Sequence, residues 1–332
     1  MRANTDWFRD ARWGVFFHYL ADVHLPPEVL ETDAGVAAWN RLVDGFDVEG
    51  LAAQIAELQA GYFFLTLGQN SGYWLSPNAT YDELVGRQPS RLSSRDLVAD
   101  LSAALGKVGV PLLVYCPACA PNRDQLAVRQ LRCTPPWDAA RLGFPPESMF
   151  PEDAARTDER LTEFQQNWEA ILREWSLRWG EGVRGWWIDG CYQADRMYRH
   201  PDPPNFASFA AAMKAGNPQS LVAFNPGVIV PVISHTEFED YTAGEISAAL
   251  PVQTNQEWDG GQLGRYVEGA QYQLLSYLGP TWGSGEPRFP DGLVAEYTRY
   301  VNSWEGVVTW DVPTQPSGLI SAPFFRQLKQ LS

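Results

Sequence analysis

The chain has few cysteines, few basic residues and no long hydrophobic run. Four cysteines in 332 residues are too few for the disulfide framework of a small secreted protein. The 25 lysines and arginines are outnumbered by 40 acidic residues, for a net charge of -15. Binding to nucleic acid or to an anionic membrane requires a basic face. We therefore expect neither nucleic acid nor membrane as a partner.

The N-terminus also lacks the apolar segment of a signal peptide or a transmembrane helix. Cytoplasmic localisation is the resulting expectation, unless a leader has been removed from a secreted protein. No Ser/Gly-rich linker or low-complexity segment interrupts the chain. The length could hold two small domains, but a single (β/α)8 barrel of the TIM type, at about 250 residues or more with insertions, accounts for all of residues 1–332. Nothing in the sequence indicates the oligomeric state.

The cysteines do not form a recognisable metal or redox set. Cys116-Pro117-Ala118-Cys119 has the spacing of a redox pair or of half a zinc site, but Cys133 and Cys191 stand alone. Because a zinc site of this kind needs a second pair, we expect no metal site.

Short β-rich runs alternate with longer amphipathic runs, the pattern of βα units that close on a parallel sheet. Strands are predicted at residues 13–19, 62–67, 110–115, 186–189, 221–224 and 307–310, strand six with its exit loop at 238–245, and either a strand or a helix at 272–278. Helices are predicted at residues 48–59, 94–105, 158–179, 206–215, 293–303 and 322–331. The long irregular segment 117–153 is predicted to cross the mouth of the barrel, where substrate contacts collect in this fold.

One apolar run, residues 185–192, delivers a carboxylate next to a glycine and is framed by aromatic side chains. Burying an unpaired carboxylate is costly, so Asp189 at the end of this strand is not there for core packing. Trp186, Trp187 and Tyr192 have flat faces of the kind that stack on sugar rings. The alternative is that Asp189 caps the next helix or pairs with an arginine.

Four stretches, in order along the chain, resemble the catalytic domain of the family 29 α-L-fucosidases. They are residues 7–19, 66–75, Trp187-Ile188-Asp189-Gly190 and 307–328. The resemblance spans the whole catalytic barrel and implies a (β/α)8 fold. The C-terminal β-sandwich that often follows in that family has no counterpart before Ser332.

The resemblance assigns roles residue by residue. Asp189 falls on the catalytic nucleophile, Trp187 on a tryptophan that contacts the sugar, and His18 on a histidine that hydrogen-bonds a sugar hydroxyl. Residues 240–245 resemble the stretch that carries the acid/base in some members, which indicates Glu245. Other glutamates compete for this role, above all Glu237 and Glu239, and then Glu257 and Glu286.

Further substrate contacts are predicted at the rim of the barrel. Trp282 resembles a tryptophan after strand seven of the family, and Tyr192 follows the nucleophile strand. The loop after strand two supplies four more candidates, namely Gln69, Asn70, Tyr73 and Trp74.

The chain departs from the family in two places. Gln69 and Asn70 stand where the family has two histidines, and Asn225-Pro226-Gly227 stands where an arginine is usual. Because Gln and Asn cannot carry a proton or a charge at neutral pH, these changes imply a changed sugar, a changed linkage or lost catalysis.

The chemistry implied by the resemblance is retaining hydrolysis of a terminal fucose or a related sugar, with an oligosaccharide or glycoside as substrate. One carboxylate attacks the anomeric carbon and the second acts as acid and then as base, so no metal or organic cofactor is needed. Two alternatives remain open: a non-catalytic carbohydrate-binding barrel, and an unrelated TIM-barrel enzyme such as an isomerase.

Overall fold

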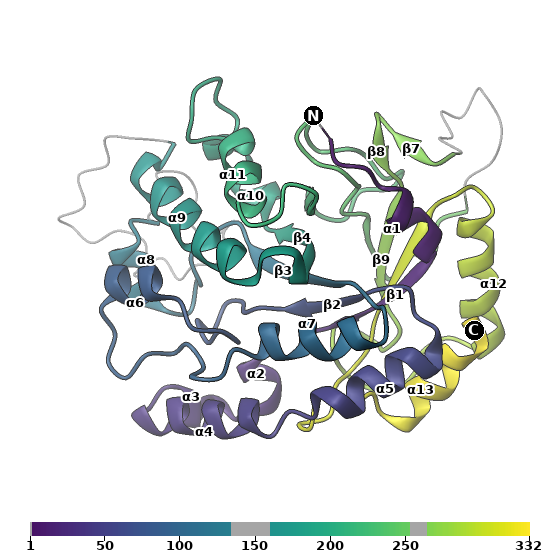
Figure 1. The fold of residues 1–332 in the computed structure, drawn as a ribbon, viewed down its shortest axis with the longest axis horizontal. Helices are drawn as coiled ribbons and strands as arrows, with labels where there is room; N and C mark the ends of the chain where they lie inside the picture. The colour runs from purple at the N-terminus through teal and green to yellow at the C-terminus, as the bar shows by residue number, and fades with distance from the viewer. Residues whose placement is uncertain (1, 134–159, 253–263) are drawn as a thin grey trace.

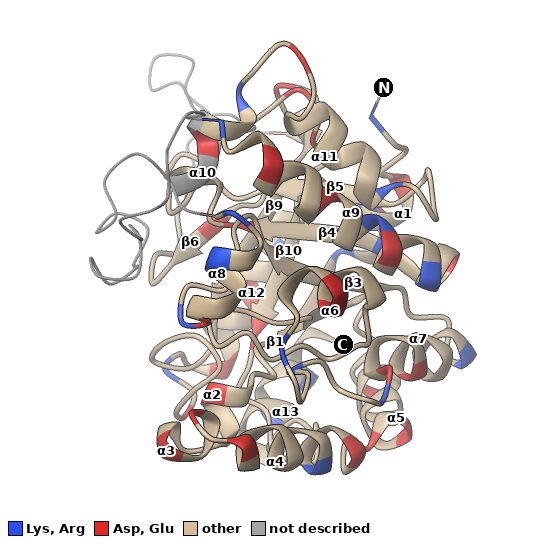
Figure 2. Ribbon diagram, turned by 90° about the vertical axis from the view of Figure 1, so that its left-hand side faces the viewer, with Lys and Arg blue, Asp and Glu red and all other residues tan. Residues whose placement is uncertain are grey.

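The computed structural model describes residues 2–133, 160–252 and 264–332. Within these residues, eight strands form one parallel sheet in the order β5-β4-β3-β2-β1-β10-β9-β6. The strands lie at the centre of the molecule with helices around them (Figures 1 and 2). Their bounds are β1 Trp13–Phe17, β2 Phe63–Thr66, β3 Leu112–Pro117, β4 Val183–Asp189, β5 Leu221–Phe224, β6 Glu245–Ser247, β9 Gln273–Tyr277 and β10 Val307–Asp311, and a separate antiparallel pair is formed by β7 Tyr266–Val267 and β8 Ala270–Gln271.

The described helices follow the amphipathic runs. They are α1 Asp6–Ala11, α2 Ala21–His24, α3 Pro27–Leu30, α4 Asp33–Asp44, α5 Val48–Leu58, α6 Ala79–Val85, α7 Leu97–Lys107, α8 Gln125–Gln130, α9 Thr162–Trp179, α10 Cys191–Tyr198, α11 Phe206–Met213, α12 Asp291–Asn302 and α13 Ala322–Leu328. Aspartates start α5 and α7, because Asp47 accepts a hydrogen bond from Gly50 N and Asp96 accepts one from Ala99 N. None of the described helices is both long and apolar enough to cross a bilayer.

The strands bury both of their faces, in two separate clusters. Along β1, Phe16 belongs to an inner cluster, whereas Val15 and Phe17 belong to the layer between sheet and helices. Successive side chains of a strand point to opposite faces, so one strand feeds both layers. Phe8 of α1 joins the inner cluster and packs on the rings of Tyr62 and Tyr241 at 4.8 and 5.0 Å. A filled interior inside a ring of helices is the arrangement of a TIM-like barrel.

The expected alternation of strands and helices fails after β5. Residues 225–244 contain no helix, and the prediction of strand six is wrong over residues 238–244. The reason lies in Asp240, whose side chain takes the N–H of Val222 at 2.8 Å, a group that a neighbouring strand would otherwise bind. The backbone N–H of Asp240 reaches Val222 O at 2.7 Å, and its carbonyl accepts from Gln271 N at 3.0 Å. An irregular segment therefore lies between the sheet edges β5 and β6.

The other predicted elements match the structure to within a few residues, and the ambiguous segment 272–278 is the strand β9. Within the predicted long loop, residues 125–130 form α8, while residues 134–159 lie outside the described residues. All four cysteines are free thiols.

Candidate active site

The carboxyl ends of β4, β5 and β6 bring two carboxylates and one amide together. Asp189 is the last residue of β4, Asn225 follows β5 directly, and Glu245 begins β6. The amide nitrogen Nδ2 of Asn225 donates to Asp189 Oδ1 at 2.9 Å and to Glu245 Oε2 at 2.6 Å. The two carboxylate oxygens therefore share one donor atom.

The orientation of this amide is fixed from its other side. Asn225 Oδ1 accepts the N–H of Gly227 at 3.0 Å, and the backbone N–H of Asn225 donates to Ile188 O at 2.8 Å. The side chain is fully buried. Because the oxygen is held by Gly227, both hydrogens of the NH2 group remain for the two carboxylates.

Asp189 accepts two further hydrogen bonds. Its own neighbour Gly190 donates N–H to Oδ1 at 2.8 Å, and the Tyr115 hydroxyl donates to Oδ2 at 2.5 Å. Gln69 Nε2 in turn donates to the Tyr115 hydroxyl oxygen at 2.6 Å. Neutral donors thus surround Asp189, and no arginine or lysine ion pair is found at Asp189 or Glu245 among the described residues.

Glu245 is tuned to hold a proton near neutral pH. Its pKa is raised to about 7, first by burial and then by the Asp189 charge, against the opposing effects of the Asn225 hydrogen bond and of His18. A carboxyl group with such a pKa can donate a proton at neutral pH, and the Asp189 carboxyl group is bound by the same amide nitrogen. A proton donor and a nucleophile would require such a pair of neighbouring carboxyl groups.

His18 follows β1 directly, and Trp282 precedes Gly283. Both His18 and Gly283 bond Asp311, the last residue of β10. His18 Nδ1 lies 2.7 Å from Asp311 Oδ1, and Gly283 N donates to Asp311 Oδ2 at 2.7 Å. A carboxylate can only accept, so the hydrogen sits on Nδ1 and Nε2 is left for other partners. The Trp282 ring packs on His18 at 5.5 Å and on Tyr277 at 4.8 Å.

The remaining predicted contacts divide into rim and core. Trp187 is stacked on Tyr115 at 5.4 Å and donates Nε1–H to Ala243 O, in the inner cluster. Tyr192 is 50% exposed, and Asn70 is half-buried on the same loop as Gln69. Tyr73 and Trp74, in contrast, are not brought to the site.

Tyr73 and Trp74 are buried in the outer layer of the core. The Tyr73 hydroxyl donates to Leu30 O at 2.9 Å, and Trp74 packs between Trp168 and Trp175 at 5.8 and 5.4 Å. Gly68 and Trp74 form an antiparallel backbone bridge, and both rings lie in the core beyond it. Their placement is that of packing residues.

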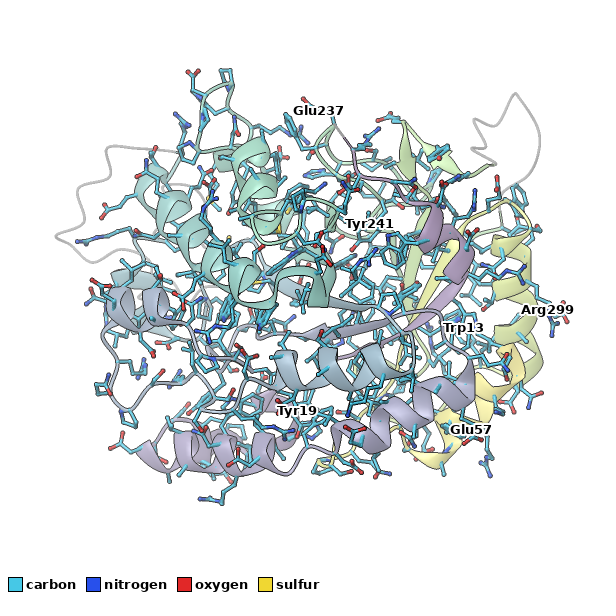
Figure 3. All side chains as sticks on the ribbon, viewed as in Figure 1. Trp13, Tyr19, Glu57, Glu237, Tyr241 and Arg299 are labelled. Carbon is cyan, nitrogen blue, oxygen red and sulfur yellow. The ribbon has the colours of Figure 1, made fainter. Side chains whose placement is uncertain are left out.

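The glutamates that compete with Glu245 lie elsewhere. Glu239 is fully buried and accepts backbone N–H groups of His235 at 2.6 Å and Phe224 at 3.3 Å. Glu237 lies at the edge of the molecule, whereas Tyr241 lies at its centre (Figure 3). Glu286 is exposed, and Glu257 lies outside the described residues. Among the glutamates of this set that the structure describes, Glu245 alone hydrogen-bonds a partner of Asp189.

Sequence reasoning missed Tyr115 and Asp311 as parts of the site, and it noted Asn225 as a departure from the family without assigning it a contact with the carboxyl groups. Each of them ends a predicted strand or follows it directly, which is the position of functional residues in a parallel barrel. This positional signal could have found all three. No group of three or more His, Cys, Asp or Glu side chains is arranged to hold a metal ion in the described ranges.

No family model and no curated protein matches the chain. Solved structures do. An endo-fucoidan hydrolase of glycoside hydrolase family 107, MfFcnA4, has 17% identity and a TM-score of 0.70 over 98% of this chain and 53% of its own. A bacterial fucosidase bound to an iminocyclitol inhibitor has 15% identity and a TM-score of 0.65 over 100% of this chain and 74% of its own.

The α-L-fucosidase AlfC, in complex with Fuca(1,6)GlcNAc, is similar in length as well, with 14% identity and a TM-score of 0.63 over 99% of this chain and 97% of its own. The chain therefore has the fold of fucose-acting glycosidases. It spans about half the length of the family 107 hydrolase.

Proposed function

We propose that the chain, over residues 1–332, is a retaining exo-glycosidase that releases a terminal fucose or a stereochemically related sugar. The observation that carries the proposal is the shared amide of Asn225. Asp189 Oδ1 and Glu245 Oε2 lie 2.9 and 2.6 Å from the same nitrogen, which limits their separation to about 5.5 Å. Retaining enzymes hold their two carboxyl groups about 5–5.5 Å apart, whereas inverting enzymes need about 6.5–9.5 Å to fit a water.

In the first step, an oxygen of Asp189 forms a bond to the anomeric carbon while the bond from that carbon to the leaving oxygen breaks. Glu245 gives its proton to the leaving oxygen. In the second step Glu245, now ionised, takes a proton from water, the water oxygen bonds the anomeric carbon, and Asp189 is released as a carboxylate. The pKa of Glu245 near 7 suits a group that is an acid in one step and a base in the next.

Three neighbours keep the reacting groups in place. Tyr115 and Asn225 donate hydrogen bonds to Asp189, and both donors are neutral groups. His18, oriented by Asp311, has a ring nitrogen left to bond a sugar hydroxyl. The names of the similar structures, which include fucosidases and endo-fucoidan hydrolases, support fucose as the first sugar to test.

The sugar can differ from that of the fucosidases, because the loop at Gln69 is used differently. Gln69 donates to Tyr115 and thereby supports the nucleophile rather than standing free for a hydroxyl. A site that pairs particular hydroxyls discriminates strongly against sugars without them. The test must therefore include sugars related to fucose.

The test is release of the aryl group from α-L-fucoside, β-D-galactoside and β-L-arabinoside by the parent chain and by Asp189→Asn. We expect turnover of one sugar, a product whose first-formed anomer has the configuration of the substrate, and loss of turnover in the variant. Asp195→Asn, which changes a half-buried carboxylate paired with Arg199 on α10, is the matched control. Sugar binding without turnover by the parent would instead favour a carbohydrate-binding barrel, and an inverted product would refute the retaining mechanism.

A further inference from the structure

Tyr277 ends β9 at the mouth of the barrel, and the proposed mechanism does not use it. Along β9, Leu274 lies in the outer layer of the core and Leu275 in the inner cluster. Because successive side chains of a strand alternate between its faces, Tyr277 points to the inner side, as Leu275 does. Trp282, which packs on Tyr277 at 4.8 Å, also packs against the inner cluster. Tyr277 therefore faces the interior at the same end of the strands as the two carboxyl groups.

A continuous set of ring contacts joins Tyr277 to the proposed nucleophile. The Trp282 ring lies 4.8 Å from the Tyr277 ring and 5.5 Å from the His18 ring. The His18 ring lies 6.0 Å from the Tyr115 ring, and the Tyr115 hydroxyl donates to Asp189. Aromatic pairs pack at centroid distances of about 4.5–7 Å, so each ring contacts the next. These five side chains follow one another around the mouth.

Ser247 closes this set on the side of the proposed acid. It lies two residues after Glu245, at the end of β6, and its Oγ is 3.3 Å from the Tyr277 hydroxyl oxygen. Asn225 then joins Glu245 to Asp189. With one link along β6, the contacts thus form a closed ring around the candidate site. The hydroxyl pair of Ser247 and Tyr277 occupies the part of this ring next to Glu245.

The backbone of Ser247 is strained. Its φ is +49°, in the left-handed region that residues other than glycine rarely adopt, and the register of β6 on β9 shifts between Glu245 and Ser247. Its carbonyl oxygen accepts from Ser276 Oγ at 2.7 Å and from Arg288 Nη2 at 3.3 Å. Such strain persists where the surroundings over-determine it, and it clusters at active sites. Ser247 is therefore held in a fixed conformation two residues from the proposed acid.

The hydroxyl pair suits a neutral hydroxyl group of a ligand. One of the two hydroxyls donates to the other, so the pair retains one hydrogen to donate and lone pairs to accept. Within the described ranges, neither hydroxyl has another hydrogen-bond partner. Arg288 stacks on the Tyr277 ring at 4.2 Å, but it directs its N–H groups mainly to backbone carbonyl oxygens, including that of Ser247. A sugar hydroxyl, which both donates and accepts, matches what the pair offers.

We propose that Ser247 and Tyr277 bind one hydroxyl of the sugar on which Asp189 and Glu245 act, and thereby select sugars that carry this hydroxyl. The inference rests on the proposed function and deepens it, because it names two residues that determine which sugar is accepted. Neither residue takes part in a bond or proton transfer.

The test combines variants with deoxygenated substrates. Tyr277→Phe keeps the ring contacts and Ser247→Ala keeps the Cβ, but each loses its hydroxyl. For whichever of the three aryl glycosides the parent hydrolyses, forms that lack one ring hydroxyl each are assayed with the parent and both variants. For the fucoside, the α-L-galactoside is added, since it carries one further hydroxyl on the exocyclic carbon.

A hydrogen bond between neutral groups is modest in strength, so each variant should lower kcat/KM by about 3- to 10-fold for sugars that carry the recognised hydroxyl. For the one sugar that lacks this hydroxyl, the variant and the parent should be equal. If the losses from substitution and from deoxygenation multiply at every hydroxyl, the pair does not bind the sugar. That result would leave the proposed hydrolase intact.

Tyr272→Phe is the matched control. Tyr272 and Tyr277 are both 7% exposed, but Tyr272 precedes β9 and so lies at its other end. This variant should leave the ratios among the sugars as in the parent. A Tyr272→Phe variant that changed these ratios as Tyr277→Phe does would refute a specific role of the pair.

Binding separates the two proposals when no glycoside is hydrolysed. Calorimetry then measures the affinity of L-fucose, its monodeoxy forms and L-galactose for the parent and for Tyr277→Phe. A variant that weakens the binding of every sugar except those without one particular hydroxyl would support the pair in a carbohydrate-binding barrel. An equal effect on all of the sugars, or no binding of any of them, would overturn the inference.

Discussion

Two regions of the molecule, one with buried and one with half-buried carboxyl groups, bind those groups differently. Beside β5, Asp240 accepts from Lys214 Nζ at 2.6 Å, from Val222 N at 2.8 Å and from Ala3 N at 2.6 Å. At the carboxyl ends of the strands, Asp189 and Glu245 share the neutral amide of Asn225. A lysine and backbone N–H groups bind the carboxylate in the first region, whereas neutral donors, with Asn225 shared between them, bind the two carboxyl groups in the second.

This difference distinguishes a carboxylate that stabilises the fold, Asp240, from the carboxyl groups proposed to react, Asp189 and Glu245. A buried carboxylate paired with a cation keeps its charge and its place, and removal of the partner leaves a costly unpaired charge. Two carboxyl groups that share neutral donors cannot both ionise easily, so one of them retains a proton. Glu239 complicates the comparison. It is as buried as Asp240, and burial raises its pKa to about 8 in spite of hydrogen bonds from Ser234 and from the backbone N–H of His235.

The largest expected effect comes from Glu245→Gln. A glutamine cannot give its proton to a leaving oxygen, so kcat for a glycoside of a poor leaving group should fall by about 10²- to 10⁴-fold. A glycoside of a good leaving group, such as a nitrophenol, needs little protonation and should lose much less in the first step. Rates for both substrates, measured by alcohol or nitrophenol release, check this.

Glu239→Gln is the control for that variant, since Glu239 is also buried with a raised pKa but does not contact the Asp189 site through any hydrogen bond of the described residues. It should change stability and leave the dependence on the leaving group as in the parent. If Glu239→Gln, and not Glu245→Gln, produced that dependence, the acid/base assignment would be reversed.

The next effect is expected from Asn225→Asp, which has the same shape but replaces the shared donor with a third carboxyl group. Loss of a preorganised donor typically costs about 10²- to 10³-fold in kcat. The added negative charge should also raise the pKa of Glu245, so the limb of kcat/KM that falls with rising pH should move to higher pH. Kinetics from pH 5 to 9 measure both.

Asn217→Asp provides the comparison for Asn225, because Asn217 is a buried asparagine that bonds Val183 O at the other end of β4. It should destabilise the fold without moving the pH profile. An unchanged profile in Asn225→Asp would show that the shared amide does not couple the two carboxyl groups.

The sequence predicts much of the arrangement of the candidate site, because the ends of the strands can be recognised in it. Asp189 ends an apolar run and is followed by Gly190, so its place at the mouth was predictable. Glu245 was reached only through resemblance, and the strand predicted before it was wrong. Next to β5, the side chain of Asp240 replaces the backbone pairing of a neighbouring strand. A local hydrophobic pattern cannot predict this bond, because Asp240 and Val222 are far apart in sequence.

The loop after β2 shows a second limit. Gln69 and Trp74 are five residues apart, but one supports Tyr115 near the carboxylates and the other packs on helix α9. Gly68 and Trp74 form an antiparallel bridge that closes this loop. Polarity predicted a substrate contact for Gln69, whose amide donates to Tyr115 in the structure, and aromaticity alone could not distinguish a sugar platform from a core ring.

A smaller effect is expected from Tyr115→Phe. The variant keeps the stack on Trp187 and loses the hydroxyl that donates to Asp189. A hydrogen bond to a charged group is worth about 1.5–3 kcal/mol, so kcat/KM should fall by about 10- to 100-fold. Tyr62→Phe, whose hydroxyl bonds Thr309 at 2.7 Å in the barrel interior, should affect stability alone. Equal activity of Tyr115→Phe and the parent would exclude Tyr115 from positioning the nucleophile.

The smallest expected effect is a shift of the thermal unfolding midpoint with pH. It tests the protonation of one glutamate from each region, Glu239 and Glu245. Burial raises the pKa of Glu239 from 4.5 to about 8 in the folded chain. The folded state therefore binds more protons than the unfolded state between these pH values, and the stabilisation associated with this group is lost as pH rises through that window. Glu239→Gln removes the titration, so its midpoint relative to the parent should rise by about a few degrees from pH 5 to 8 and then level off.

Glu245→Gln should show the same sign over a shorter window, because the folded pKa of Glu245 is about 7. The rise should end one pH unit earlier and be smaller, since Glu245 is less buried than Glu239. Parallel midpoints for a variant and the parent at every pH would mean that its glutamate is ionised in the folded protein. For Glu245 that result would remove the acid from the proposed mechanism, and for Glu239 it would make the residue an ordinary ionised partner of backbone N–H groups.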